Sequence, residues 1–272
     1  MGLVDPPGKI IDGNINFKGK DLSALSDDQM QNIRGNRIAM IFQDPMMTLN
    51  PVLRIETQMI EAIQAHDGSI SREDARVRSR DTLGLVGISS PDERLRAYPL
   101  QFSGGMRQRV SIAIAMLNRP DLIIADEPTT ALDVTIQGQV ISEMQKLCRE
   151  TQTALLWITH DLAVVAGIAD RVCVMYAGRI VEQGLVANII ANPMHPYTQG
   201  LMGSVPSQNQ RGKPLQQIDG MVPSMLNLPV GCAFQNRCNY ANEKCSNMQP
   251  DIAQVADGRQ VRCFNISSGQ QL

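Results

Sequence analysis

The run Leu122-Ile123-Ile124-Ala125-Asp126-Glu127 places four apolar residues directly before two carboxylates. This order constrains the fold more than any other feature of the chain. A short, wholly apolar run predicts a strand that is buried on both faces, which is typical of a parallel sheet. Such a strand ends at the carboxyl edge of its sheet, where α/β proteins bind ligands. Taken alone, the run is equally consistent with a strand that ends in a solvated acidic turn.

Helix and strand patterns alternate around this run. Periodicity predicts helices over 104–118 and 135–150, and strands over 121–126, 153–159, 171–177 and 179–184. Upstream, the pattern predicts short strands within 11–17 and over 37–42, a short helix capped by Ser26, and helices over 52–100, one of them starting near Ser71. Strands separated by helices indicate an α/β fold whose mostly parallel sheet is covered by helices on both faces.

Charge and hydropathy narrow the possible partners. The net charge is −2 and the two signs are interspersed, so the composition gives no electrostatic support to a nucleic-acid partner. No apolar run approaches the roughly 20 residues that span a bilayer, and the first residues do not resemble a secretory signal. We therefore expect an intracellular protein that reaches a membrane through a partner.

The two carboxylates suit metal-assisted hydrolysis. Asp126 can hold Mg²⁺, usually through water, because this hard cation prefers oxygen ligands. Glu127 can orient or polarise an attacking water. Ser103-Gly104-Gly105 precedes the helix that leads into the same strand, and exposed N–H groups at a helix start favour anions. On its own, Ser-Gly-Gly is a common loop sequence.

Further motifs follow in a fixed order. Gln43 lies in Ile41-Phe42-Gln43-Asp44-Pro45, Phe102 to Met106 surrounds the Ser-Gly-Gly, residues 131–133 read Ala-Leu-Asp, and Thr159-His160-Asp161 follows the next strand. In this order the sequence resembles the nucleotide-binding subunits of ABC transporters over about residues 10–190. The matches are the Q-loop, the signature motif (with Met106 where glutamine is usual), Walker B at 122–127, the D-loop and the switch histidine.

The resemblance implies a role for each matched residue. Glu127, His160 and Gln43 are the expected catalytic residues, with His160 at the γ-phosphate and Gln43 linking Mg²⁺ and water to a helical subdomain. The expected ATP-contacting positions are Ser103, Gly104, Gly105, Gln108, Asp126 and Asp133, and the expected Mg²⁺ positions are Asp126 and Gln43. In this family two subunits enclose ATP between one P-loop and the other subunit's signature motif.

The phosphate-binding loop of the family is missing from the sequence. The chain's Gly-Lys pairs, at 8–9, 19–20 and 212–213, lack the following Ser or Thr and follow no apolar strand. In the family this loop precedes the segment that resembles residues 3–17, so we expect a chain shortened at its N-terminus. We therefore predict weak or absent ATP binding and no turnover by the isolated chain.

Four of the six cysteines, Cys232, Cys238, Cys245 and Cys263, lie near the end of the chain. In an intracellular protein such a group suggests metal ligation more than disulfides. The spacing lacks the paired C-x₂-C of zinc sites, and an iron–sulfur cluster, zinc and unliganded thiols all remain open.

Flanking residues sharpen the resemblance. His195-Pro196-Tyr197-Thr198 and the segment from Gly231 to Cys238 are similar to the C-terminal extension of oligopeptide and dipeptide importer ATPases. That subfamily implies a [4Fe–4S] cluster on the four cysteines, with a structural role. The expected organisation is a truncated ABC ATPase domain over 1–192, with a helical subdomain at about 52–103, and then a linker and extension over 193–272.

The leading hypothesis is the ATPase subunit of a peptide-class ABC importer, peripheral on the cytoplasmic face of the inner membrane. Its expected partners are a second ATPase subunit, identical or different, membrane permease subunits and, through the complex, a substrate-binding protein. Importer subunits for nickel or glutathione share these motifs. The alternative is an inactive homologue that only pairs with an intact subunit. ABC proteins of DNA repair or translation would have long coiled coils or tandem cassettes, which this sequence lacks.

Overall fold

The computed structural model describes residues 1–4, 6–130, 132–205, 217–255 and 258–266. The chain divides into two compact units, Met1–His160 and Asp161–Leu272. Ala131 of the expected D-loop and the Gly-Lys pair at 212–213 lie outside the described residues. Within the described ranges, no helix is long and apolar enough to cross a membrane.

A three-stranded parallel sheet forms the centre of the first unit. Its strands are β3 (Ile38–Ile41), β4 (Leu122–Asp126) and β5 (Ala154–Ile158), with β4 in the middle. Ile41 pairs with Ala125, and Asp126 pairs with Ile158. The strands predicted over 37–42, 121–126 and 153–159 and their parallel order are confirmed. All three strands therefore end at the same edge of the sheet.

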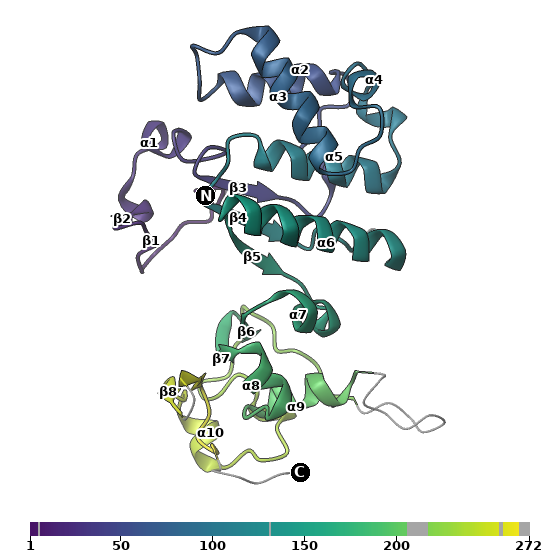
Figure 1. Ribbon diagram of the computed structural model, residues 1–272. Helices are drawn as coiled ribbons and strands as arrows, with labels where there is room; N and C mark the ends of the chain where they lie inside the picture. The colour runs from purple at the N-terminus through teal and green to yellow at the C-terminus, as the bar shows by residue number, and fades with distance from the viewer. Residues whose placement is uncertain (5, 131, 206–216, 256–257, 267–272) are drawn as a thin grey trace. The chain divides into compact units, whose positions relative to one another are not determined.

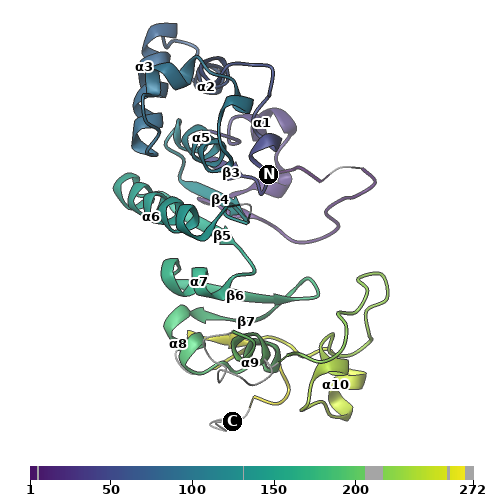
Figure 2. The same ribbon diagram turned by 90° about the vertical axis from the view of Figure 1, so that its right-hand side faces the viewer.

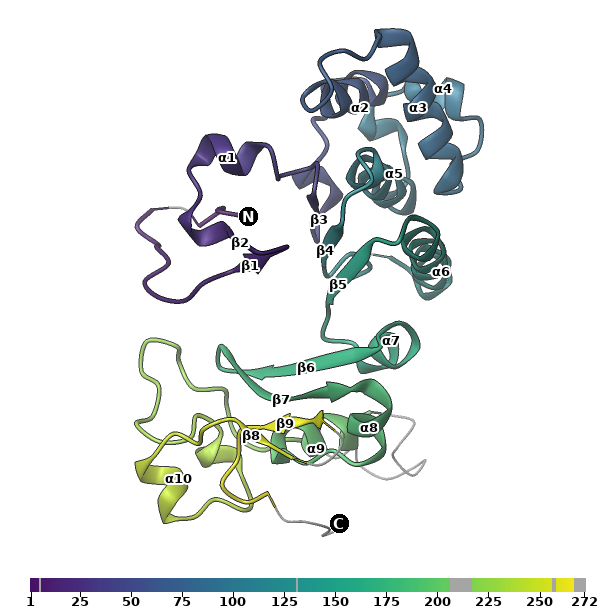
Figure 3. The same ribbon diagram turned by 60° about the vertical axis from the view of Figure 1, so that its left-hand side comes forward.

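Two long helices cover one face of this sheet (Figure 3). They are α5 (Gly104–Met116), capped by Ser103, and α6 (Val134–Thr151), capped by Asp133, as predicted within two residues at each end. Ile41, Ile123 and Val110 are fully buried in the shared core. Burial of these branched side chains, at about 1.5–3 kcal/mol each, holds the strand ends in place.

A short hairpin and a short helix lie on the opposite face of the sheet. The hairpin of β1 (Asn16–Phe17) and β2 (Lys20–Asp21) precedes α1 (Asp27–Gln31), which Ser26 caps in a capping box. Met30 and Ile38 are buried there, and Leu122 and Ile124 pack against them. The alternation that begins at Ile11 forms a strand only at its end, because residues 11–15 make no ladder.

A group of helices follows β3. It contains α2 (Ile55–Gln64), α3 (Arg72–Leu85) and α4 (Pro91–Leu95), which lie together in Figure 1. Ser71 caps α3, as predicted. The apolar stripe of α2 is completely buried, at Ile55, Met59, Ile60 and Ile63. The 3₁₀ turns Pro45–Met47 and Pro99–Gln101 connect this group to β3 and to α5.

The second unit is built on an antiparallel sheet in the order β6-β7-β9-β8. β6 (Arg171–Tyr176) and β7 (Arg179–Leu185) are joined by the two-residue turn Ala177-Gly178, and β8 (Ala253–Gln254) and β9 (Gln260–Val261) complete the sheet. The strands predicted over 171–177 and 179–184 are confirmed, but they do not extend the parallel order. A two-residue turn can only join antiparallel neighbours.

Helices of the second unit pack beside its sheet (Figure 2). They are α7 (Leu162–Ile168), α8 (Val186–Ala191), α9 (Pro196–Gly203) and the short α10 (Glu243–Asn247). The segment that begins at residue 193, which was expected to start with a linker, therefore contains a packed helix near its start. Pro196 occupies the first turn of α9, where a missing N–H costs nothing, so this proline starts a helix instead of marking a linker.

Candidate functional site

Glu127 follows the last residue of β4 in a left-handed backbone conformation, with φ of 44°. Its N–H donates to the carbonyl of Ile158 at 3.0 Å, which ties the turn to the end of β5. A left-handed backbone at a residue other than glycine costs about 1–3 kcal/mol and is concentrated at functional sites. The conformation turns the Glu127 side chain out at the carboxyl edge of the sheet.

Three side chains contact the Glu127 carboxylate. Gln43 Nε2 donates to Oε2 at 3.3 Å, Thr130 Oγ1 donates to the same oxygen at 3.0 Å, and His160 Nδ1 lies 3.0 Å from Oε1. Gln43 follows β3 and His160 follows β5, so each of the three strands of the sheet supplies one of these residues. The structure thus brings together the three residues expected to be catalytic. Thr130 was not singled out, and its position in the turn after the acids was the available signal.

Glu127 is held in its ionised form. The hydrogen bond with His160, followed by that with Thr130, keeps the pKa of the Glu127 carboxyl below its usual value of 4.5. The His160 side chain is 71% exposed, so the ion pair adds little stability. At neutral pH Glu127 can therefore accept a hydrogen bond from a water but cannot act as a proton donor.

The Ser-Gly-Gly segment has two different faces. Ser103 Oγ accepts from the N–H of Met106 at 3.3 Å, and both Ser103 and Gly104 are exposed. A Cβ at Gly104 would meet nothing within 4 Å, whereas one at Gly105 would lie 2.8 Å from Ile136 Cγ2 of α6. Gly104 thus faces solvent, and Gly105 makes room for the packing of α5 against α6.

Three further residues, Gln108, Asp126 and Asp133, were expected to contact the nucleotide. Gln108 is buried, and its Nε2 has no hydrogen-bond partner in the described part of the chain. Asp126 is half-buried at the end of β4, beside Glu127. Asp133 accepts from the N–H groups of Thr135 and Ile136, each at 3.1 Å. The Asp133 carboxylate therefore caps α6 in this structure, and Gln108 does not reach the surface.

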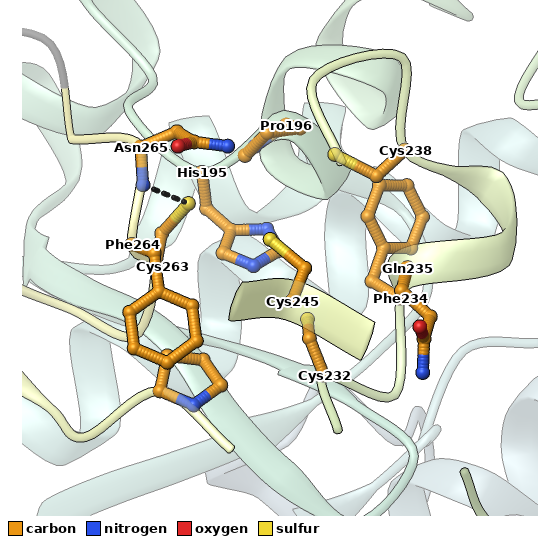
Figure 4. A pocket seen from close by; sticks show the side chains of 11 residues that line it. His195, Pro196, Cys232, Phe234, Gln235, Cys238, Cys245, Cys263, Phe264 and Asn265 are labelled. Atoms are coloured by element: carbon orange, nitrogen blue, oxygen red, sulfur yellow. Dashed lines mark hydrogen bonds between the residues drawn. The ribbon is translucent and has the colours of Figure 1, made fainter. Parts of the chain in front are cut away.

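The four C-terminal cysteines line one pocket of the second unit (Figure 4). Cys245 is buried, the other three are half-buried, and all four are free thiols. His195, Phe234 and Asn265 complete much of the wall. Four cysteines that are far apart in the sequence are thus gathered around one pocket, and sulfur is the shared chemistry of its lining.

Burial favours the protonated form of three of these thiols. It raises the pKa of Cys263 to about 11 and also raises the pKa values of Cys232 and Cys238. A metal that binds thiolates must therefore displace protons here. Thiolate is the ligand of both zinc and iron–sulfur clusters, so the donor set fits either one. As the described side chains lie, no three His, Cys, Asp or Glu residues converge closely enough to hold a metal ion.

His195 lies in the wall of the same pocket and is buried. Its Nδ1 accepts from the N–H of Tyr197 at 3.0 Å, so a neutral ring carries its proton on Nε2. Burial lowers the pKa of His195 to about 4. The fully buried Glu182 accepts from the N–H groups of Met194 and His195, each at 2.9 Å. The sequence shows the His-Pro start of a helix but not this burial.

Comparisons with known protein families give one match in each of the two units. The family described as "ABC transporter" matches residues 1–130. The family described as "Oligopeptide/dipeptide transporter, C-terminal region" matches residues 181–245, which include most of the β7 strand and three of the four cysteines.

Curated relatives match nearly the whole chain. The dipeptide transport ATP-binding protein DppD of Bacillus subtilis (strain 168) is 49% identical over 265 residues, which cover 97% of this chain and 79% of that protein. The oligopeptide transport ATP-binding protein AppD of the same organism is 48% identical, over 97% of this chain and 80% of that protein. DppD of Escherichia coli (strain K12) is 46% identical over 263 residues, with the same two coverages.

A solved structure shares the fold. The ATP-binding cassette MJ0796, solved as a dimer in a post-hydrolysis state bound to ADP and Pi, superposes with a TM-score of 0.58 at 28% identity. The match covers 65% of this chain and 74% of that one. With the relatives above, it shows that the chain belongs to the ABC transporter ATP-binding subunits of the oligopeptide/dipeptide transporter family.

Proposed function

We propose that this chain is the ATPase subunit of an ABC importer for dipeptides or oligopeptides, on the cytoplasmic face of the inner membrane. The convergence of Gln43 and His160 on an ionised Glu127 carries the proposal. Relatives named for dipeptide and oligopeptide transport support the substrate class. Nickel and glutathione are the alternative substrates.

Each residue at this edge of the sheet has a different role in hydrolysis. Glu127 orients the attacking water through its ionised carboxylate, and His160 and Gln43 fix that carboxylate from both sides. Asp126, at the end of β4, would hold Mg²⁺ together with Gln43, whose Nε2 donates to the neighbouring Glu127. Phosphate oxygens and water complete the coordination of Mg²⁺ in such sites, so a cage of three side chains is not required.

The second subunit completes each ATP site. Ser103 and Gly104 lie exposed at the start of α5, where backbone N–H groups favour phosphate, and they face the ATP held by the partner. In the ATPase dimer the partner supplies a P-loop that the present 272 residues do not contain. Permease subunits, and through them a substrate-binding protein, complete the importer.

ATP titration and ATPase assays test this assignment. The isolated chain should bind ATP weakly and show no turnover, because its sequence has no Gly-x-x-x-x-Gly-Lys-Ser/Thr to grip phosphate. Addition of a subunit of the family that carries a P-loop should give ATP hydrolysis that depends on Ser103 and Gly104. Low-micromolar ATP binding by the chain alone would contradict the expectation of weak binding. If pairing occurs but no hydrolysis appears, the chain is the inactive partner.

The cysteine pocket is the second part of the proposal. Cys232, Cys238, Cys245 and Cys263 would hold a [4Fe–4S] cluster with a structural role, and zinc is the alternative. Support comes from four thiols lining one pocket. Anaerobic purification followed by visible absorbance and by iron, sulfide and zinc analysis separates the two metals. Colourless protein without iron would contradict the cluster.

A further inference from the structure

Two asparagines outside the set of metal donors connect the cysteine loops. Asn242 Nδ2 donates to Asn265 Oδ1 at 2.8 Å, across a separation of 23 positions in the sequence. Asn242 precedes α10, which carries Cys245, and Asn265 lies two positions beyond Cys263. One hydrogen bond therefore joins the Cys245 helix to the Cys263 loop.

Asn242 also fixes Cys245 directly. Its Oδ1 accepts from the backbone N–H of Cys245 at 3.2 Å and from the Cys245 thiol at 3.4 Å. The first bond is the N-terminal cap of α10, and the second points the thiol back toward the cap. Both oxygen and nitrogen of this amide are thus in use.

Asn265 reaches two further loops. Its Nδ2 donates to the carbonyl of Tyr240, two residues after Cys238. Its backbone N–H donates to the sulfur of Cys263 at 3.4 Å. The pair Asn242–Asn265 therefore touches the chain beside Cys238, Cys245 and Cys263.

Cys232 is held by backbone alone. Its N–H donates to the carbonyl of Cys245 at 2.8 Å. A Cβ at Gly231 would lie 2.1 Å from that same carbonyl oxygen, so this approach needs glycine. The fourth cysteine thus reaches the pocket without help from the asparagine pair.

We propose that Asn242 and Asn265 are positioning residues that hold three cysteine loops around the pocket before a metal binds. This inference rests on the proposed metal-binding role of the pocket. Because no three donors converge as the described side chains lie, the thiols must move closer together when a metal binds. Loops that are already tied together have less entropy to lose in that step.

The role requires an amide at each position. An aspartate at 242 would still cap α10, because its oxygen accepts as well as that of asparagine. The aspartate would have no N–H to donate to Asn265 Oδ1. A carboxylate oxygen would then lie against the Asn265 amide oxygen, and both atoms are acceptors. Asn242 is exposed, and an exposed hydrogen bond contributes about 1 kcal/mol or less, so the pair should act on loop position more than on overall stability.

The test compares Asn242→Asp with Asn239→Asp. Asn239 is exposed in the Cys238 loop, so its variant adds the same charge near the pocket without breaking the pair. The first measurement is the rate at which a chelator removes iron from anaerobically purified protein. We expect roughly ten-fold faster loss for Asn242→Asp, in line with the effect of residues that support metal ligands, and a wild-type rate for Asn239→Asp.

A second measurement uses the metal-free chain. Alkylation of individual cysteines, followed by peptide mass analysis, should be several-fold faster at Cys245 and Cys263 in Asn242→Asp, with an unchanged melting temperature. Unchanged alkylation would overturn the positioning role. Wild-type protein that takes up no metal would overturn the metal-binding proposal, while the alkylation result would still decide the role of the pair.

Discussion

At the residue scale, the two glycines of the Ser-Gly-Gly segment differ: one is needed for helix packing, and the other is exposed and free to contact a nucleotide. Gly105 lies against Ile136, and Gly104 faces open space. Sequence motifs treat the two glycines alike, although their surroundings differ. Substitution of each one therefore tests a different property.

Gly105→Ala should destabilise the protein by about 1–3 kcal/mol, because its methyl group must displace a β-branched side chain. Gly104→Ala should leave stability unchanged or raise it by about 0.4–1 kcal/mol. Urea unfolding followed by fluorescence of Trp157, the single tryptophan, measures both. If Gly104→Ala unfolds more easily than wild type, the open environment described for Gly104 is wrong. Loss of ATP hydrolysis by the paired subunits in a stable Gly104→Ala would support the signature role.

His195 should make the second unit sensitive to acid. Its pKa is about 4 when folded and 6.5 as a free side chain, so the unfolded state takes up a proton first as the pH falls. This contribution to stability is complete above pH 6.5 and is lost progressively down to pH 4, by up to about 3.5 kcal/mol at 1.4 kcal/mol per pKa unit. His195→Asn keeps a helix cap and should flatten this dependence.

Near-ultraviolet circular dichroism of the metal-free chain can follow this unfolding. Tyr176, Tyr197 and Phe234 form an aromatic cluster in the second unit, with ring centroids 4.7–5.5 Å apart. Equal slopes of stability against pH in wild type and His195→Asn would show that another group causes the acid sensitivity.

At the element scale, Arg109 joins three helices of the first unit. From α5, its Nη1 donates to the carbonyl of Val86, at the end of α3, at 2.7 Å. The same nitrogen lies 2.6 Å from a carboxylate oxygen of Glu143 on α6. The Arg109 side chain is 11% exposed, so little water is present to replace these bonds.

Arg109→Met should therefore lower the free energy of unfolding by about 1–3 kcal/mol, because it leaves a half-buried carboxylate and a carbonyl without their charged donor. Arg80→Met is the matched control, since Arg80 pairs with its exposed neighbour Asp81 and should contribute almost nothing. Unfolding in urea, with Trp157 fluorescence as the signal, gives both values. Equal effects of the two substitutions would mean that Arg109 does not join the helices energetically.

Most elements could be predicted because local patterns determine them. The apolar runs of β3, β4 and β5, and the caps Ser26, Ser71 and Ser103, agree with the structure. Helix α9 was missed because the segment from residue 193 was expected to begin with a linker, although a proline such as Pro196 is also common in the first turn of a helix. The strand expected from Ile11 forms only at Asn16–Phe17, because that is where it pairs with β2.

The sequence could predict which residues belong to the candidate site, but it could not predict the contacts that they make. The strand ends place Gln43, Glu127 and His160 at one edge, and their motifs named them in advance. The capping role of Asp133, the burial of Gln108 and the Asn242–Asn265 bond depend on tertiary packing. No local pattern encodes a contact between side chains that lie in separate loops.

At the scale of the whole molecule, the compact units divide after His160, whereas the sequence suggested a boundary after residue 192. Residues 161–192 pack with the C-terminal segment because β7 pairs with β9. Whether 1–192 and 193–272 act as functional domains stays a prediction.

Metal removal should affect one unit. The four cysteines belong to Asp161–Leu272, so a chelator should raise amide hydrogen exchange in 232–265, the segment that contains β9. Exchange in β3, β4 and β5 should not change, and those strands serve as the internal control. A uniform rise over both units would contradict the independence of their cores.

The pairing of β7 with β9 also has a consequence during protein synthesis. Glu182 and Gln183 lie opposite Val261 and Gln260, which are translated close to the end of the chain. Because ribosomes add about 5–20 residues per second, the hairpin of β6 and β7 must wait for several seconds with one edge unpaired. Nascent chains are thus most exposed to strand-to-strand association in this interval, after the first unit has emerged and before the last strand has arrived.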